Sequence, residues 1–335
     1  MRIGTHDTDE RVLVIAEVGN NHEGDLERAR ELVRAAAASG ADAVKFQTFR
    51  TELFASPADA ERFARLRSFE LSQDDFASLA ELARAEGLLF VSTPLDLESA
   101  AFLERTADAV KIASGDNTFY PLLEHVARSD RPMIVSTGLI DGDEAAEVLA
   151  FVRRHRPAGA EVALLHCVTA YPADPADVQL RAIPELAARL DCTIGYSDHT
   201  LGIDACVAAV ALGARILEKH FTLDPPPSDF RDHALSARPQ ELAELVERVR
   251  AVETLLGAGG KRAQASELAL NEAVRRSICV RRDLPAGHRL EADDLVWLRP
   301  GTGIAPGREA EVVGRVLRRA LAASEQLRDE DLTNS

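Results

Sequence analysis

Thr193-Ile-Gly-Tyr-Ser-Asp-His199 and Ile216-Leu-Glu-Lys-His-Phe221 are the two pieces of sequence that decide the fold. Each is a short apolar run that leads into charged and imidazole side chains. The alanine-rich residues between them have the pattern of a helix. A strand, a helix and a second strand in this order form one unit of a parallel α/β fold.

The same unit repeats from Val12 to about Gly257. We expect strands at Val12–Val18, Ala43–Thr48, Leu88–Ser92, Ala109–Ala113, Met133–Thr137, Val162–Val168, Thr193–Ser197 and Ile216–Phe221. Amphipathic helical patterns lie between them, for example at Leu26–Ser39, Asp74–Glu86, Asp143–His155 and Glu241–Leu256. Eight strand–helix units over about 245 residues have the size of a (β/α)8 barrel.

Polar residues at the strand ends distinguish a barrel from a doubly wound sheet, which also alternates strands and helices. Nearly every predicted strand ends in reactive or ligand-type side chains: Glu17, Lys45, Gln47, Ser92, Thr93, Lys111, Ser114, Ser136, Thr137, His166, Ser197 to His199 and Glu218 to His220. A closed barrel gathers all its carboxyl-terminal strand ends round one mouth, whereas an open sheet spreads them along an edge. We therefore predict an α/β fold with a TIM barrel over residues 1–260.

The sequence changes character after Gly257. The segment Gly257-Ala-Gly-Gly260 is a flexible break, and the linker at 261–275 contains a predicted short helix, Glu267–Arg275. Residues 276–335 are expected to form a small β-rich domain with strands at Arg276–Val280, Asp283–Gly287, Val296–Leu298 and Arg315–Leu321. About 60 residues are marginal for independent stability, so we expect this domain to pack on something larger.

Composition limits the partners. The chain has 335 residues, of which 46% are hydrophobic, and a net charge of −16. Nucleic acid and anionic membranes are therefore excluded as main partners, and an anionic substrate has to be bound by a local cluster of Lys, Ser and backbone N–H groups. The four cysteines form no CxxC pair, the N-terminus is polar and no apolar stretch approaches about 18 residues. We expect a soluble cytoplasmic protein.

Two histidines end neighbouring predicted strands. Adjacent barrel strands would place His199 and His220 a few ångströms apart at the mouth. Two imidazoles with open positions for water or substrate suit a borderline divalent ion such as Mn, Co, Fe or Zn. A pair of hydrogen-bonding histidines without a metal fits the sequence equally well.

Two lysines lie inside apolar strands, where burial is costly unless each is paired with an anion. Lys45 and Lys111, with Ser114, Ser136 and Ser197, form a predicted cradle for phosphate and carboxylate. In the alternatives, one lysine is the nucleophile of a Schiff-base aldolase, or the lysines pair with Glu17 and Glu218. Glu17 could also orient or deprotonate a water near a metal.

Several short motifs lie along the chain, most of them at the ends of predicted strands. They are Ile15-Ala-Glu-Val-Gly-Asn-Asn-His-Glu-Gly24, Lys45-Phe-Gln47, Ser92-Thr-Pro94, Lys111-Ile-Ala-Ser-Gly115, Ser136-Thr-Gly138, His166-Cys167, Tyr171-Pro172, Gly195-Tyr-Ser-Asp-His-Thr200 and Glu218-Lys-His-Phe-Thr-Leu-Asp224. Together they resemble the N-acetylneuraminate (sialic acid) synthase family. The tail Val296-Trp-Leu-Arg-Pro-Gly-Thr-Gly-Ile304 resembles that family's C-terminal SAF domain, which is similar to type III antifreeze proteins. The resemblance extends from about Val12 to Leu332.

This resemblance implies an enzyme that condenses phosphoenolpyruvate with an N-acetylmannosamine-like aldehyde and water, and releases phosphate. It implies His199 and His220 as ligands of a divalent metal, typically Mn, with Mg or Co also used. Residues Lys45, Lys111, Ser114, Ser136 and Ser197 match the phosphoenolpyruvate-binding positions, Glu17 matches the general base, and Gln47, Tyr171 and Glu218 line the sugar end or the metal shell. The family works as a homodimer in which the SAF domain swaps onto the partner's barrel, and Arg299 matches the arginine that it offers to the sugar.

Three positions depart from the family pattern. Thr169 stands where many members have Asn, Asp116 stands where some have Glu, and Phe230-Arg-Asp-His233 replaces Gly-Pro-Asp-His in the loop 224–236. These positions face the sugar in family members, so the acceptor and the nonulosonic acid product stay open. The alternatives are a phosphoenolpyruvate-dependent aldol synthase of the deoxy-heptulosonate or deoxy-octulosonate type, and a non-catalytic carbohydrate-binding protein.

Overall fold

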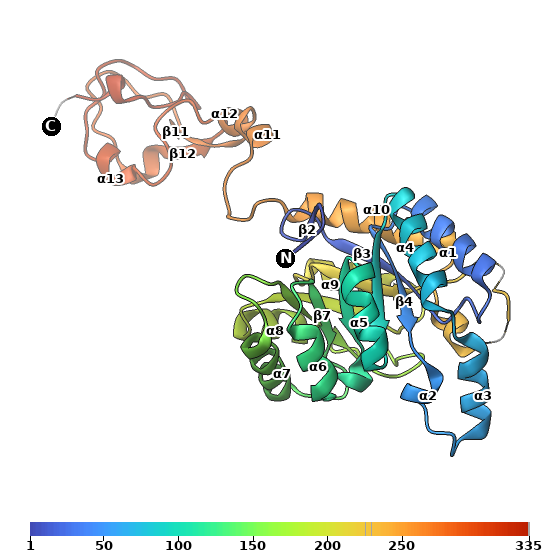
Figure 1. Cartoon of the computed structure of the whole chain (residues 1–335). Helices are drawn as coiled ribbons and strands as arrows, with labels where there is room; N and C mark the ends of the chain where they lie inside the picture. Colours follow the sequence, from blue (N-terminus) through green and yellow to red (C-terminus); the bar gives the residue numbers. More distant parts are fainter. Residues whose placement is uncertain (225, 229, 334–335) are drawn as a thin grey trace. The chain divides into compact units, whose positions relative to one another are not determined.

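The computed structural model describes residues 1–224, 226–228 and 230–333, and it contains a closed barrel of eight strands (Figure 1). The barrel strands are β3 (Leu13–Gly19), β4 (Ala43–Thr48), β5 (Leu89–Pro94), β6 (Ala109–Ile112), β7 (Met133–Ser136), β8 (Val162–Cys167), β9 (Thr193–Asp198) and β10 (Ile216–His220). Every neighbouring pair is parallel, and β10 closes the barrel against β3. The predicted TIM barrel is confirmed.

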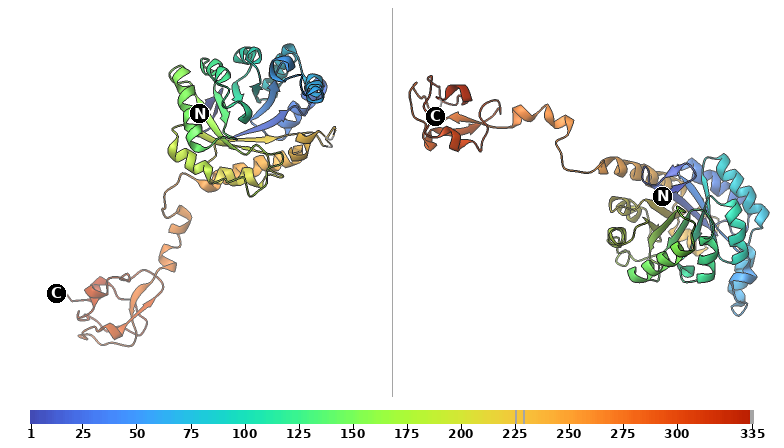
Figure 2. Two further views of the ribbon diagram at one scale, coloured as in Figure 1. Left: turned by 90° about the horizontal axis from the view of Figure 1, so that it is seen from below. Right: turned by 60° about the vertical axis from the view of Figure 1, so that its left-hand side comes forward.

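Helices surround the strands on the outside of the barrel (Figure 2). They are α1 (Leu26–Ala38), α2 (Thr51–Phe54), α3 (Ala60–Phe69), α4 (Gln73–Ala85), α5 (Leu97–Thr106), α6 (Tyr120–Ala127), α7 (Gly142–His155), α8 (Ala182–Arg189), α9 (Asp204–Ala211) and α10 (Pro239–Leu256). Several begin at a side chain that accepts a hydrogen bond from the first turn, as Asp25, Asp96 and Asp141 do for α1, α5 and α7. Such caps fix where each strand–helix loop ends.

The barrel interior is apolar toward the amino-terminal ends of the strands. Its inward-facing residues form one cluster: Leu13, Ile15, Ala43, Val91, Ala109, Ile134, Ala163, Leu165 and Ile216. A short hairpin of β1 (Arg2–Ile3) and β2 (His6–Asp7) adds Met1 and Ile3 to the same cluster. The alternate strand residues, such as Val14, Phe46 and Val110, pack against the helices. Polar chemistry inside the barrel therefore has to lie toward the carboxyl ends of the strands.

The chain divides into two compact units, of which the first is Met1–Gly257 and the second begins at Ala258. The second unit contains α11 (Ala265–Leu268), α12 (Asn271–Val274), β11 (Ser277–Val280), β12 (Leu295–Leu298) and α13 (Glu309–Val312). Strands β11 and β12 pair antiparallel, and its apolar core includes Ile278, Leu295 and Leu327. The predicted small C-terminal β domain is confirmed.

Two details of the tail prediction were wrong. The expected strands Asp283–Gly287 and Arg315–Leu321 are not continuous strands, because only isolated bridges such as Leu284 with Leu321 connect them. The expected helix Glu267–Arg275 is instead the two short helices α11 and α12. Across the ranges that the structure describes, no helix combines the length and the apolar character needed to cross a bilayer.

Candidate active site

A ring of mostly polar side chains lies directly above the apolar layer. The eight strands carry Glu17, Lys45, Thr93, Lys111, Ser136, Cys167, Ser197 and Glu218 in this ring. Each lies two residues beyond the last apolar residue that its strand adds to the layer, or beyond Gly195 in β9. Because side chains alternate along a strand, this next position faces the barrel interior as well. All eight side chains are buried, with at most 6% of any residue exposed. The barrel thus brings six of the predicted site residues into one layer, together with Thr93 and Cys167.

The two lysines of this ring are held by two carboxylates. The Nζ atom of Lys45 lies 2.8 Å from Oε2 of Glu17, and Oε2 of Glu218 lies 3.7 Å from the Nζ atoms of both Lys45 and Lys111. Lys45 also donates to Oγ1 of Thr93 at 3.1 Å. Glu218 is therefore the bridge between the two ammonium groups, which is the pairing that the sequence left open as an alternative.

Two serines complete the ring beside these charges. Lys111 donates to Oγ of Ser136 at 2.6 Å, and Ser197 donates to Oε1 of Glu218 at 2.9 Å. Hydroxyls that are bonded to charged groups hold fixed orientations. An anion that entered the ring would meet two ammonium groups and two oriented hydroxyls.

The charges of the ring shift the pKa values of its members in different directions. Burial raises the pKa of Glu17 to about 7, with Lys45 opposing the rise and Glu218 adding to it. Burial also lowers the pKa of Lys111. For Glu218, burial is outweighed by Lys111 and Lys45, which hold the pKa of this carboxyl below its usual range. Glu218 is thus the ionised partner of the lysines, and Glu17 is the carboxyl closest to exchanging a proton at neutral pH.

The two histidines lie at the next step toward the mouth. The ring centres of His199 and His220 are 5.3 Å apart. Two imidazoles that bind one divalent ion at about 2.1 Å hold their ring centres roughly 5 Å apart. The Nδ1 atom of His199 donates to the carbonyl of Val168 at 2.7 Å, which leaves Nε2 as an acceptor. The Nδ1 atom of His220 is buried without a hydrogen-bond partner.

These features fit a divalent metal ion. Burial, followed by the charge of His199, lowers the pKa of His220 well below its usual value, so this ring stays in the neutral form that binds metals. In the part of the chain that the structure describes, no group of three or more His, Cys, Asp or Glu side chains is arranged to hold an ion. The chain would therefore supply two imidazoles, with water and substrate in the remaining positions.

A second polar cluster is formed by Ser114, Gly138 and Thr169. The backbone N–H of Gly138 donates to Oγ of Ser114 at 3.1 Å, while Oγ1 of Thr169 is buried without a partner. A Cβ atom at position 138 would lie 2.2 Å from Oγ1 of Thr169 and 2.6 Å from Oγ of Ser114. Asn117 holds the same loop by donating to the carbonyls of Ser136 and Gly138. Only glycine leaves both hydroxyls in these positions.

The other predicted site residues lie farther out. Gln47 is half-buried and accepts from Nδ2 of Asn20 at 2.9 Å. Asp116 is half-buried, and burial raises the pKa of its carboxyl. The ring of Tyr171 lies 4.1 Å from that of His199 between centres, which places it at the mouth. Arg299 belongs to the second unit, where it follows β12 and is exposed.

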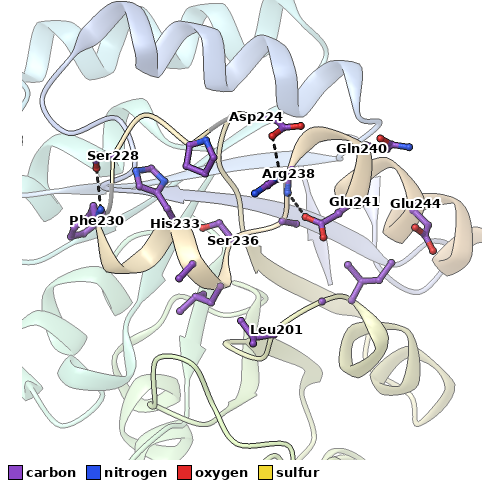
Figure 3. Close-up of a pocket in the computed structure, with 16 residues that line it drawn as sticks. Leu201, Asp224, Ser228, Phe230, His233, Ser236, Arg238, Gln240, Glu241 and Glu244 are labelled. Atoms are coloured by element: carbon purple, nitrogen blue, oxygen red, sulfur yellow. Dashed lines mark hydrogen bonds and ion pairs between the residues drawn. The ribbon is translucent and has the colours of Figure 1, made fainter.

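Residues of the loop that follows β10 lie in two different places: one contacts Tyr171, and others line a separate hollow. The guanidinium of Arg231 lies 5.2 Å from the centre of the Tyr171 ring, whereas Phe230 and His233 line a hollow of about 670 Å³ together with Leu201 (Figure 3). His233 Nε2 lies 3.2 Å from Oε1 of Glu23, so the loop is tied to the one after β3. Residues 225 and 229 of this loop lie outside the described residues.

Sequence reasoning assigned no individual site role to Thr93, Cys167, Asn117 or Arg231, although it quoted Thr93, Cys167 and Arg231 within motifs. The first two could have been found from the period of two, since each follows an apolar inward residue by two positions. The contacts of Asn117 and Arg231 join loops and could not be predicted from the sequence, which marked Arg231 only as part of Phe230-Arg-Asp-His233. His166, which ends a predicted strand, bonds the carbonyl of Val178 and stacks on Tyr196.

A parallel eight-stranded barrel that carries buried lysines, carboxylates and an imidazole pair at its carboxyl end defines an enzyme of the TIM-barrel class. Residues 32–261 match the model of the NeuB family, and residues 275–333 match that of the SAF domain. The chain belongs to the NeuB family. It is an enzyme of the nonulosonic acid synthases, which are phosphoenolpyruvate-dependent transferases.

Three relatives illustrate the similarity. N,N'-diacetyllegionaminic acid synthase of Legionella pneumophila is 41% identical, covering 94% of this chain and 92% of that protein. Human N-acetylneuraminate-9-phosphate synthase is 38% identical, covering 84% and 81%. The crystal structure of N-acetylneuraminic acid synthetase from Leptospira borgpetersenii, in complex with citrate, is 34% identical with a TM-score of 0.75, covering 80% and 94%. The family is therefore defined, while the names of the relatives differ in the sugar.

Proposed function

We propose that the chain condenses phosphoenolpyruvate with an N-acetylmannosamine-like amino-sugar aldehyde and water, and releases phosphate by cleavage of a C–O bond. One observation carries the proposal. The buried pair Lys45 and Lys111, bridged by Glu218, lies in the same barrel mouth as the imidazole pair of His199 and His220. A site for a strong anion thus adjoins a site for a metal that can bind a carbonyl oxygen.

The anion side supports the binding of phosphoenolpyruvate. Its phosphate and carboxylate need several cations and donors, and on a chain of net charge −16 these must be local. Lys45, Lys111, Ser136 and Ser197 are buried in one layer, and Ser114 lies above them. Before substrate binds, the carboxylates of Glu17 and Glu218 keep the two ammonium groups paired. The cradle is therefore preorganised without an unpaired buried charge.

The chemistry requires one new carbon–carbon bond and one broken carbon–oxygen bond. The double-bond electrons of phosphoenolpyruvate attack the aldehyde carbon from C3, and the aldehyde oxygen takes a proton to become a hydroxyl. Water adds to the electron-poor C2, and Glu17 accepts its proton. The C2–O bond to phosphate then breaks with its electrons on the phosphate oxygen, and the C2 hydroxyl loses its proton to leave a 2-keto acid.

The residues of this chain have separate tasks in that sequence. His199 and His220 would hold a divalent ion, which when bound supplies Lewis-acid polarisation of the aldehyde oxygen. Glu218 keeps Lys45 and Lys111 ionised and in place, because it lies between them. Glu17, with a pKa of about 7, can accept a proton at neutral pH and pass it on.

The acceptor side supports an N-acetylated amino-hexose. Tyr171 offers an aromatic ring beside His199, and the guanidinium of Arg231 lies 5.2 Å from the centre of that ring. Asp116 and Thr169 add half-buried polar atoms that can bind sugar hydroxyl and amide groups. With Gln47 and the tail residue Arg299, these are the residues that we propose to select the sugar. Mass distinguishes a neuraminic product from the diamino products, and NMR distinguishes legionaminic from pseudaminic acid, which are stereoisomers of equal mass.

The test is a phosphate-release assay with phosphoenolpyruvate, Mn²⁺ and a panel of acceptors, analysed by mass spectrometry. The panel holds amino-hexoses with and without a 6-phosphate, and four- and five-carbon sugar phosphates. We expect phosphate and a nine-carbon 2-keto acid in equal amounts with an N-acetylated acceptor. Turnover only with five- or four-carbon sugar phosphates would instead favour a deoxy-octulosonate or deoxy-heptulosonate synthase. Absence of phosphate release with every acceptor would leave a non-catalytic carbohydrate-binding role.

A Schiff-base lyase is the one competing mechanism with an observation in its favour, namely the lowered pKa of buried Lys111. A neutral amine of this kind can attack a carbonyl. Borohydride treatment in the presence of pyruvate would then add the mass of the reduced adduct to Lys111. We expect no adduct, because the ammonium group of Lys111 is paired with Glu218 and hydrogen-bonded to Ser136.

We further propose that the metal is Mn, that the protein is a cytoplasmic homodimer, and that its SAF domain is swapped. Exposed apolar side chains on α10 and the segment after it support assembly: Leu255, Leu256, Leu268, Leu270 and Val274. Free cysteines, two of them fully buried, agree with a reducing compartment. Light scattering on the purified chain should give the mass of two copies, and a monomer at micromolar concentration would contradict the dimer.

A further inference from the structure

A buried ion pair lies on the outer side of the barrel wall, directly behind the two histidines. The Nζ atom of Lys219 lies 2.8 Å from Oδ2 of Asp198, and the two residues are 1% and 0% exposed. They occupy opposite positions in the register of β10 and β9. Each immediately precedes a predicted metal ligand in the sequence. Because side chains alternate, Lys219 and Asp198 face the helices while Glu218 and Ser197 face the interior.

The ion pair also holds the backbone beyond His199. Lys219 donates to the carbonyl oxygen of Thr200 at 2.6 Å, and the N–H of Thr200 donates to Oδ1 of Asp198 at 2.9 Å. The hydroxyl of Thr200 donates to Oδ2 of the same carboxylate at 3.2 Å. His199 therefore lies between two residues that are both fixed by this one ion pair.

A second set of contacts fixes the carboxylate itself. The hydroxyl of Tyr196 donates to Oδ1 of Asp198 at 2.8 Å, and Sγ of Cys206 in α9 lies 3.5 Å from Oδ2. The carboxylate is thus held from its own strand, from α9 and from β10. The surrounding residues, such as Leu217 and Ile194, are apolar. A buried ion pair in such surroundings contributes little net stability compared with apolar side chains of the same volume.

We propose that Lys219 and Asp198 are positioning residues that set the spacing of the His199 and His220 imidazoles for a divalent ion. The pair joins β10 at the residue before His220 to the loop on both sides of His199. It thereby holds the two ligand-bearing segments at one separation without touching metal or substrate. This inference deepens the proposed function, on which it rests for the identity of the ligands.

The test compares two double variants that each remove both partners of an ion pair. Asp198→Asn with Lys219→Met removes the pair behind the histidines. The control is Asp42→Asn with Arg250→Met, a part-buried pair whose removal also takes one ion-pair contact each from Arg11 and Glu253. In the control pair, Nη2 of Arg250 lies 2.6 Å from Oδ2 of Asp42, and that carboxylate accepts from the N–H of Val14 near the amino-terminal end of β3.

Two quantities are measured for each full-length variant: the dissociation constant of Mn²⁺, from the electron paramagnetic resonance signal of the free ion, and the urea midpoint of unfolding in chelator. We expect both variants to lose stability, because each loses buried hydrogen bonds. Only the first should bind Mn²⁺ more weakly, by about 10- to 100-fold, as is usual when partners of metal ligands are changed. Its kcat should recover when Mn²⁺ is raised to saturation, whereas that of the control should need no extra Mn²⁺.

Equal Mn²⁺ affinity in the two variants would overturn the positioning role and leave the ion pair as a stabilising contact only. A wild-type chain that binds no Mn²⁺, Co²⁺ or Zn²⁺ would refute the metal part of the proposed function, which is a separate outcome. If the Asp198→Asn, Lys219→Met variant does not fold, Asp198→Asn with Lys219→Gln keeps a donor for Thr200. We then expect an intermediate loss of Mn²⁺ affinity, and unchanged affinity would again overturn the proposal.

Discussion

Gly138→Ala is the substitution that tests the anion cradle most directly. The added Cβ would lie 2.2 Å from Oγ1 of Thr169 and 2.6 Å from Oγ of Ser114, and both distances are far below ordinary van der Waals contact. At least one hydroxyl has to move by about 1 Å, and displacements of this size cost up to about 100-fold in rate when reacting groups depend on them. The Gly138 backbone is not in the left-handed region, so the alanine adds no strain of its own.

The expected loss of phosphoenolpyruvate affinity follows from the hydrogen bond that Ser114 would lose. A hydrogen bond to a charged group contributes about 1.5 to 3 kcal/mol. Losing the one that we propose between Ser114 and phosphoenolpyruvate should weaken binding by roughly 10- to 100-fold, at about 1.4 kcal/mol for each factor of ten. Overpacking should also destabilise the barrel by about 1 to 3 kcal/mol.

Gly115→Ala provides the matched control. This glycine follows Ser114 directly and has no positive φ, and a Cβ atom added to it would meet nothing within 4 Å beyond its chain neighbours. The assay is isothermal titration of each variant with phosphoenolpyruvate in Mn²⁺, together with the KM for phosphoenolpyruvate and the melting temperature. If Gly138→Ala binds phosphoenolpyruvate as tightly as Gly115→Ala does, Ser114 is not part of the cradle and the reasoning fails.

Three further predictions concern the metal, the tail and acid stability. His220→Ala should abolish metal-dependent phosphate release while the circular dichroism spectrum is kept, and full activity in chelator would refute the metal role. Arg299→Ala should raise the KM of the sugar at least about tenfold, the loss of a charged hydrogen bond, but leave that of phosphoenolpyruvate unchanged; an unchanged sugar KM would contradict its assignment. Although burial opposes it, bonds from Glu291 N–H, His288 and Arg282 lower the pKa of Asp294 to about 2. Its stabilisation of about 2 kcal/mol is therefore present above about pH 4 and lost as the pH falls toward about 2. Asp294→Asn should flatten this pH dependence of stability, which the fluorescence of the single tryptophan, Trp297, would report. An unaltered acid transition would count against the prediction.

The barrel could be predicted because each of its strands has two recognisable features in the sequence. Each has a short apolar run, and each ends in polar residues that an ordinary strand would not need, as in the predicted Ala43–Thr48 and the observed β4. The tail has weaker signals. In the segments 283–287 and 315–321 the β pairings are isolated bridges, such as that of Arg289 with Val316, and local sequence does not mark such pairings.

Contacts between strands explain what the sequence left open. The choice of Glu218 as the bridge between Lys45 and Lys111 depends on three strands closing into a ring, and no spacing along one strand encodes it. The same holds for Lys219 and Asp198, which are adjacent in space only through the register of β10 and β9. Their charges were visible in the sequence, but their partners were not.

The lysines show why two interpretations that compete in a sequence can both describe one site. From residue types, Lys45 and Lys111 were interpreted as structural partners of carboxylates or as a cradle for an anion. In the barrel the pairing is compatible with the proposed cradle, because two ammonium groups buried at 3% and 2% exposure need counter-charges until a substrate arrives. Glu17, with its pKa raised to about 7, can take up a proton when an anion replaces it beside Lys45. The carboxylate that stabilises the empty site is then the group placed to exchange a proton in the filled one.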